Sequence, residues 1–137
     1  MKNDGILNPL LLQTIGELGH TDTLAVADAG LPIPAGVRRI DLSVVPGLPG
    51  FSEVLAALLP ELALEEAVAA EEIVQGNPEL YAKLISLLAP VPLRLVPHSA
   101  LKALLPATKG VVRTGECSPY ANVILRCGVN TYFQKAR

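Results

Sequence analysis

Residues 16–34 read GELGHTDTLAVADAGLPIP, and the short apolar run from Leu24 to Ala27 lies at the centre of this stretch. A run of small and branched apolar side chains that is closed by glycine and proline is typical of a buried strand. Asp28 directly follows the expected strand, and His20 lies before it. Because ligands of open α/β sheets bind at the carboxyl ends of the strands, Asp28 is a candidate binding residue. His20 is expected at the opposite end of the same strand.

Strand and helix patterns alternate along the rest of the chain. Asn8-Pro9 and Asn77-Pro78 are helix-start signatures, because asparagine can cap a helix and proline fits its first position. Another helix is predicted from Phe51 to Leu59, and Ser99 is expected to cap a short helix that runs to Leu105. The remaining predicted strands cover residues 37–42, 67–70, 93–96, 110–114 and 121–128.

This alternation predicts an α/β fold, namely a single three-layer α/β/α domain over residues 1–137 with a largely parallel central sheet. Residues 129–137 are more polar and are expected to form a C-terminal tail. A chain of 137 residues suits one domain. Half of the residues are hydrophobic and 18% are charged, which is more apolar surface than one small core should absorb. We therefore expect extensive contacts between subunits.

Composition also argues against several classes of partner. The net charge of −2 and the absence of a basic stripe argue against nucleic acid. No apolar stretch reaches the roughly 18 residues that span a bilayer, and no secretory signal is evident, so no membrane partner is expected. Cys117 and Cys127 lack the spacing of a metal site and are interpreted as free thiols of a cytoplasmic protein, with a disulfide as the lesser alternative.

Polar residues that could carry chemistry lie at the ends of the predicted elements. No phosphate-binding glycine loop, serine-hydrolase elbow or metal-ligand spacing is present. The candidates are His20, Asp28, His98, Lys102, Glu116, Tyr120 and Asn122. Each has an ordinary interpretation when taken alone: His20 could interact with the dipole of the preceding helix, and Asp28 could form an Asx turn. Together they are an unusual set for so apolar a chain.

Three motifs carry a resemblance to a known family. LGHTD at 18–22, DAGLPIP at 28–34 and TGECSPYAN at 114–122 resemble the D-ribose pyranase family. EEI at 71–73 and NP at 77–78 match in order and spacing, and the resemblance covers residues 1 to about 129. The sister family of fucose mutarotases is similar at the Gly-His and Thr-Gly-Glu positions, but lacks the GLPIP continuation and the CSPY run. The ribose branch is therefore the better match.

The resemblance implies an isomerase that interconverts the pyranose and furanose forms of D-ribose through the open-chain aldehyde. Ring opening takes a proton from the anomeric hydroxyl and gives one to the ring oxygen, and imidazole titrates in the range that this needs. The resemblance implies that His20 is the proton donor. It places five further residues around the sugar: Asp28, His98, Lys102, Tyr120 and Asn122. No cofactor and no metal are expected. The resemblance also implies a cytoplasmic homo-oligomer, a decamer of two pentameric rings.

Two other functions remain open at this stage. One is a fucose-type sugar mutarotase, and the other is a non-catalytic sugar-binding component of a ribose uptake system; fold alone cannot separate them. The site itself is expected to be shared between subunits. His20 and Asp28 are placed at opposite ends of one strand, while Tyr120 and Asn122 begin the last strand. One pocket can hold all four more easily if the last segment of one subunit reaches the first motif of the next.

Overall fold

The structure is a computed structural model that describes the backbone of residues 1–135 and the side chains of residues 1–133. Its strands are β1 (Thr23–Ala27), β2 (Arg39–Asp41), β3 (Leu64–Ala70), β4 (Leu93–Val96), β5 (Val111–Arg113) and β6 (Val123–Cys127). Its α-helices are α1 (Pro9–Glu17), α2 (Phe51–Leu58), α3 (Ile73–Gly76), α4 (Pro78–Leu88), α5 (His98–Leu104) and α6 (Thr131–Lys135). Two 3-10 turns follow α2 and α5, at Leu59–Glu61 and Leu105–Ala107.

All six strands form one sheet in the order β2-β5-β1-β6-β3-β4. The pairs β2–β5, β5–β1 and β3–β4 are parallel, whereas β6 runs antiparallel to both of its neighbours. Five strands therefore point the same way, which confirms the prediction of an α/β fold with a largely parallel sheet. We define the carboxyl edge as the edge where β1, β3, β4 and β5 end and β6 begins, and the amino edge as the opposite one.

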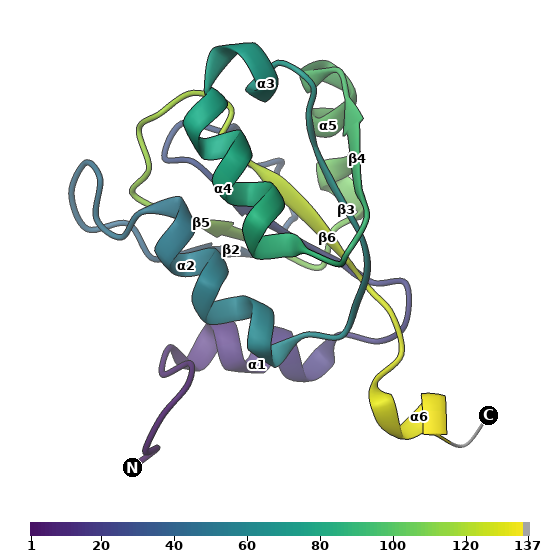
Figure 1. Cartoon of the computed structure of the whole chain (residues 1–137). Helices are drawn as coiled ribbons and strands as arrows, with labels where there is room; N and C mark the ends of the chain where they lie inside the picture. Colours follow the sequence, from purple (N-terminus) through teal and green to yellow (C-terminus); the bar gives the residue numbers. More distant parts are fainter. Residues whose placement is uncertain (136–137) are drawn as a thin grey trace.

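Helices cover both faces of the sheet, as predicted (Figure 1). On one face, α1, α2 and α4 pack against the sheet through buried side chains such as Leu11, Phe51 and Leu84. On the other face, α5 packs through Leu101 against small and branched side chains, including Ala25 and Ile124. The alternation of Leu24 and Val26 with Ala25 and Ala27 places the side chains of β1 on both faces. Because both faces are buried from Leu24 to Ala27, this part of β1 is apolar throughout.

The helix starts agree only partly with the sequence prediction. Asn8 caps α1, since its Oδ1 accepts the N–H of Leu11 at 2.9 Å. The prediction that Ser99 caps the short helix that runs to Leu105 is wrong. Helix α5 begins at His98, so Ser99 lies inside its first turn, and the carboxylate of Glu72 accepts the His98 N–H instead. A side chain from another part of the chain satisfies this helix end, and no local pattern reveals that.

Two further segments differ in detail from expectation. Helix α3 was not predicted; it forms one short turn between β3 and α4. The expected polar tail contains α6, which carries the exposed side chains of Tyr132 and Phe133 and projects from the body of the protein (Figure 1). Residues 136–137 of that tail lie outside the described residues. Among residues 1–135, no helix has both the length and the apolar character needed to span a membrane.

Candidate functional site

The end of β1 and the start of β6 are joined at the carboxyl edge by Asp28 and Asn122. The backbone N–H of Asp28 donates to Oδ1 of Asn122 at 2.9 Å, and Nδ2 of Asn122 donates to Oδ2 of Asp28 at 3.2 Å. The other Asp28 oxygen accepts the N–H of Gly30 at 3.0 Å, which is the expected Asx turn. Asn122 is only 1% exposed, while Asp28 is half-buried. The Asp28 carboxylate is therefore held in one orientation but remains accessible.

A second pair at the same edge consists of two aromatic rings. The rings of His98 and Tyr120 meet edge to face, with 5.3 Å between their centroids and an angle of 79° between their planes. The Nδ1 atom of His98 is buried and has no hydrogen-bond partner among the described residues. A buried nitrogen in this state costs free energy until a partner supplies the bond, so it is a candidate contact for a bound hydroxyl.

The backbone of Tyr120 links the two pairs. Its φ is +58°, an uncommon left-handed conformation for a residue with a side chain. Its carbonyl accepts the N–H of Asn122 at 2.9 Å. Backbone outliers of this kind cluster at functional sites, where the surrounding structure holds them in place. Lys102 lies one helical turn beyond His98 on α5 and has an exposed side chain. Four candidate residues are therefore gathered at the carboxyl edge, with Lys102 on the adjacent helix.

The first half of the TGECSPYAN motif supports this edge. Thr114 is buried, and its hydroxyl donates to the carbonyl of Ala27 at 2.8 Å, which fixes the end of β1. Gly115 exchanges backbone hydrogen bonds with Gly47 and Pro49, and a Cβ at Gly115 would overlap the backbone of Leu48. Only glycine permits this close approach of two loops. These residues shape the site, a role that no local sequence pattern predicts.

Glu116 anchors the same loop to the start of α2. Its carboxylate accepts the N–H of Phe51 at 3.0 Å and the hydroxyl of Ser118 at 2.8 Å. Burial raises the pKa of Glu116, but the hydrogen bonds from Phe51 and Ser118 outweigh burial and leave the pKa below its ordinary value. A negative charge is also favourable at the N-terminus of a helix. The loop that carries Glu116 borders a hollow of about 390 Å³, which is lined by Asp28, Ala29, Gly30, Glu116, Cys117, Ser118 and Pro119.

His20 lies at the amino edge of the sheet, away from the other candidates. Its side chain is 53% exposed, and its Nε2 lies 3.2 Å from Oε2 of Glu65. The five residues of β1 alone separate the two edges by roughly 16 Å. The structure thus bears out the prediction that His20 and Asp28 occupy opposite ends of one strand. Within one chain, His20 is not brought to the five residues that the resemblance places around the sugar.

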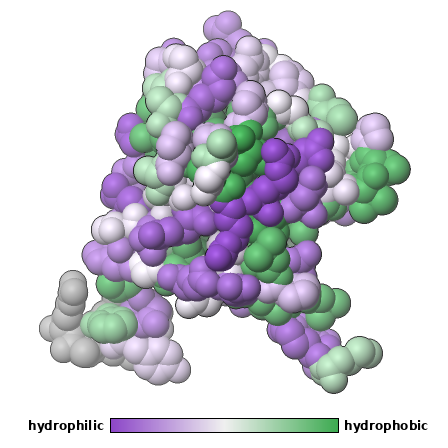
Figure 2. Space-filling view, turned by 180° about the vertical axis from the view of Figure 1, so that it is seen from behind, coloured by the Kyte–Doolittle hydropathy of each residue, from purple (hydrophilic) through white to green (hydrophobic). Residues whose placement is uncertain are grey.

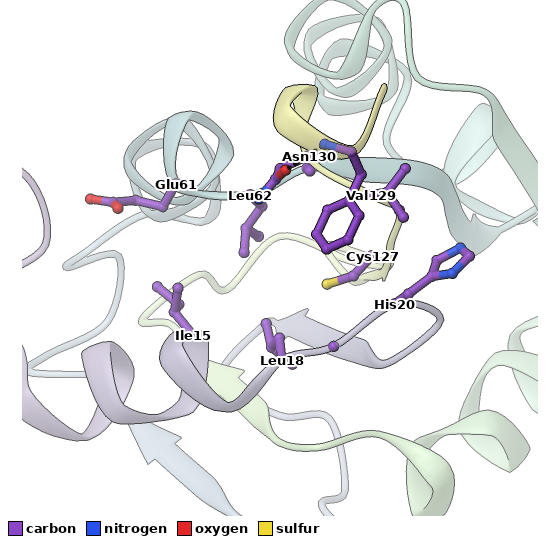
Figure 3. Close-up of a pocket in the computed structure, with 12 residues that line it drawn as sticks. Ile15, Leu18, His20, Glu61, Leu62, Cys127, Val129 and Asn130 are labelled. Atoms are coloured by element: carbon purple, nitrogen blue, oxygen red, sulfur yellow. Dashed lines mark hydrogen bonds between the residues drawn. The ribbon is translucent and has the colours of Figure 1, made fainter. Parts of the chain in front are cut away.

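His20 also lines a second, larger cavity. This cavity measures about 600 Å³, and its wall combines apolar side chains such as Ile15 and Leu62 with polar ones such as Glu61 (Figure 3). Cys127 lies in the same wall; burial, followed by the charges of Asp22 and Glu65, raises the pKa of its thiol. Cys117 and Cys127 are both free thiols, as the sequence indicated. Among residues 1–135, no group of three or more His, Cys, Asp or Glu side chains is arranged to hold a metal ion.

Comparison with known proteins places this architecture in a family. The model of the RbsD / FucU transport protein family matches residues 1–130. The chain belongs to this family. Relatives named D-ribose pyranase include one from Geobacillus kaustophilus, 51% identical over 95% of this chain and 96% of the relative. The relative named D-ribose pyranase 2 from Streptomyces griseus is 56% identical over 94% of this chain and 98% of its own length.

Solved structures of the RbsD / FucU family show the same fold. RbsD of Bacillus subtilis, complexed with D-ribose, superposes with a TM-score of 0.92 at 46% identity, over 95% of this chain and 99% of that one. The fucose mutarotase of Streptococcus pneumoniae, in complex with L-fucose, has a TM-score of 0.77 at 24% identity, over 90% and 94% of the two chains. The second likeness is one of fold alone.

Three further residues contact the site; the sequence predicted no role for Glu72 or Gly76, and for Asn77 it predicted only a helix cap. Glu72 contacts the backbone of His98, Gly76 lies against the ring of Tyr120, and Asn77 contacts the loop before Tyr120. The available signal was the match of EEI and NP to the pyranase pattern. That match marked positions, and only the tertiary contacts show what the side chains touch.

Proposed function

We propose that this protein is a D-ribose pyranase, an isomerase that interconverts the pyranose and furanose forms of D-ribose through the open-chain aldehyde. The observation that carries the proposal is the cluster of Asp28, His98, Tyr120 and Asn122 at one edge of the sheet. This cluster lies in a chain that is 46% identical to a protein solved with D-ribose. A small polyol needs several fixed donors and acceptors, and this cluster supplies both.

The substrate contacts follow from the chemistry of each group. The Asp28 carboxylate is held by Asn122 and Gly30, and each of its oxygens keeps a lone pair for a sugar hydroxyl. The imidazole of His98 and the hydroxyl of Tyr120 can each donate or accept a hydrogen bond. Lys102 adds a flexible cation that only donates. We assign these four residues, Asp28, His98, Tyr120 and Lys102, together with Asn122, to sugar binding.

We propose that His20 is the proton donor and that it acts on sugar bound by a neighbouring subunit. Ring opening gives a proton to the ring oxygen. Imidazole groups as a class can donate and accept protons near neutral pH, which suits this step. His20 lies at the opposite edge of its own sheet, with β1 in between, so its own Asp28 and Tyr120 are out of reach. A second copy can present its carboxyl edge to the exposed His20. The reaction moves only protons, so the pyranase needs no cofactor.

The assembly that we propose is the homo-oligomeric ring system implied by the family resemblance, a decamer of two pentameric rings in the cytoplasm. Exposed apolar side chains support contacts between copies. The tip of the loop after β2 carries Val44, Val45 and Leu48, which are 72%, 54% and 51% exposed. Apolar side chains gather at this tip on the outer surface (Figure 2). Such exposed groups mark association surfaces.

Saturation-transfer NMR of D-ribose with and without the protein tests the proposed activity. The expected result is faster exchange between pyranose and furanose anomeric signals when the protein is present. A parallel measurement with L-fucose serves as the comparison. Exchange of fucose anomers without ribose exchange would assign the protein to the fucose mutarotase activity. Ribose binding with no exchange would assign it to non-catalytic sugar binding, and either outcome would overturn the proposal.

A further inference from the structure

Helix α3 and its two flanking residues connect β3 to α4 at the carboxyl edge of the sheet, at the same end as α5 (Figure 1). We propose that this segment, Glu72–Asn77, positions the His98–Tyr120 pair for sugar binding. Its residues touch neither substrate nor reacting atoms in this proposal; they act through the two aromatic side chains. The role of this pair in binding ribose rests on the proposed function. The placement of the two rings does not depend on it.

The Tyr120 ring packs directly against Gly76. A Cβ added at Gly76 would lie 2.9 Å from both Cδ2 and Cε2 of Tyr120, closer than such atoms approach in proteins. Gly76 has no positive φ, so its backbone conformation does not require glycine. The close approach of the ring is the reason that no side chain fits here. A side chain at position 76 therefore requires a shift at this contact, and we expect the Tyr120 ring to move from its place against His98.

Asn77 holds the turn that leads into Tyr120. Its Nδ2 donates to the hydroxyl of Ser118 at 3.0 Å and to the carbonyl of Pro119 at 2.9 Å. Although Asn77 precedes α4, its side chain makes no capping hydrogen bond, in contrast to Asn8 before α1. The side chain is committed to the loop instead. A left-handed residue such as Tyr120 persists only where its surroundings hold it, and these two bonds do so from the adjacent residues.

Glu72 fixes the other member of the pair. Its two carboxylate oxygens accept the backbone N–H of His98 at 3.0 and 3.1 Å. This N–H begins α5 and has no partner within the helix, so the carboxylate both satisfies it and sets where the helix starts. The same six-residue segment thus contacts the backbone of His98 and the ring of Tyr120. One element controls the relative placement of two rings that come from α5 and from the loop before β6.

The test compares Gly76→Ala with the matched control Gly16→Ala. Gly16 also lies near the end of a helix, but a Cβ there meets nothing within 4 Å. On helix propensity alone, alanine stabilises a helix relative to glycine, so neither variant should unfold for that reason. We expect Gly76→Ala to raise the KM for ribose by about three- to ten-fold, the loss of roughly one hydrogen bond, with kcat unchanged. Gly16→Ala should leave both constants unchanged.

A spectroscopic readout separates positioning from stability. The chain has two histidines, so isotope-labelled histidine gives two sets of ring signals, and His20→Ala identifies those of His98. Because the Tyr120 ring lies against His98, its displacement in Gly76→Ala should shift the His98 signals and leave those of His20 in place. Asn77→Ala should shift the His98 signals and raise the KM for ribose, as Gly76→Ala does. It provides the test if Gly76→Ala does not fold.

Unchanged His98 signals and an unchanged KM in a folded Gly76→Ala or Asn77→Ala variant would overturn the positioning role. A lowered melting temperature with unchanged His98 signals and an unchanged KM would also overturn the positioning role. Failure of the proposed function looks different. In that case the parent protein does not exchange ribose, while the His98 signals of the sugar-free protein still report whether residues 72–77 place the two rings.

Discussion

Asp28 and Asn122 lie 94 positions apart in the chain, yet they exchange two hydrogen bonds at the carboxyl edge of the sheet. The Asp28 N–H donates to the Asn122 amide oxygen, and the Asn122 amide nitrogen donates to the Asp28 carboxylate. The pair exists because β6 runs antiparallel between β1 and β3, so that the start of β6 meets the end of β1. A parallel β6 would have placed Asn122 at the other edge.

Asp28→Asn should weaken ribose binding more than it weakens folding. The amide keeps the shape of the side chain but offers the sugar hydroxyls one neutral acceptor oxygen in place of two charged ones. Loss of one charge-assisted bond to a sugar hydroxyl should lower the affinity by between about ten- and one hundred-fold. Calorimetry with ribose and thermal unfolding measure the two effects. Unchanged affinity together with a lower melting temperature would mean that Asp28 only shapes its turn.

His20→Ala should slow ring interconversion by about 10²–10⁴-fold, the usual contribution of a positioned acid or base. The fold should persist, because the side chain is exposed and its contact with Glu65 lies at the surface and contributes little. Glu65→Gln is the matched control and should keep most of the activity. Saturation-transfer NMR provides the rates. Exchange at the parental rate in His20→Ala would remove this residue from the mechanism.

Mixing two inactive variants tests whether neighbouring subunits share the site. Subunits with His20→Ala and subunits with Tyr120→Ala are dissociated, mixed in equal amounts and reassembled. If His20 of one copy serves Tyr120 of the next, about one quarter of the interfaces carry both intact residues, and activity should return in that proportion.

The control for this experiment mixes His20→Ala subunits with subunits that carry both substitutions. No interface of that mixture contains both intact residues, so it should stay inactive. Sedimentation establishes that mixed oligomers have formed. A monomeric protein, or proven mixed oligomers with no recovered activity, would contradict a shared site.

Glu116→Gln should reduce the loss of stability at acid pH. The folded protein holds the Glu116 pKa below its ordinary value of 4.5. Ionised Glu116 therefore stabilises the fold above about pH 4.5, and this contribution is lost as the pH falls through the lower folded-state pKa. The parent should lose more stability than Glu116→Gln between about pH 5 and pH 3, as measured by thermal unfolding. Asp4→Asn, at an exposed position, is the control. Parallel pH profiles for the parent and Glu116→Gln would refute the role of this carboxylate.

Exhaustive dialysis against a chelator should leave the ribose exchange rate unchanged, because the proposed chemistry moves only protons. The measurement repeats the saturation-transfer experiment on the dialysed protein, with and without added divalent metal. Activity that disappears on dialysis and returns with a metal would show that proton transfer by side chains is an incomplete account.

The sequence by itself determined the local elements of this protein and where its polar groups fall among them. The apolar run before Asp28, the Asn-Pro helix starts and the alternation of elements all act over a few residues, so they can be read without a structure. They were sufficient to predict a largely parallel α/β sheet. They were also sufficient to place His20 and Asp28 at opposite ends of β1.

Only the tertiary structure decided which of these groups meet. Both faces of β6 are buried from Val123 to Leu125, so this apolar run looks the same for either strand direction. The antiparallel pairing of β6 with β1 and β3 is decided by long-range contacts. That pairing brings Asn122 to Asp28. In the same way, Glu72 reaches the first N–H of α5 from the end of a neighbouring strand, which displaces the cap expected from Ser99. Contacts between segments distant in the chain depend on strand pairing and packing, which local periodicity does not encode.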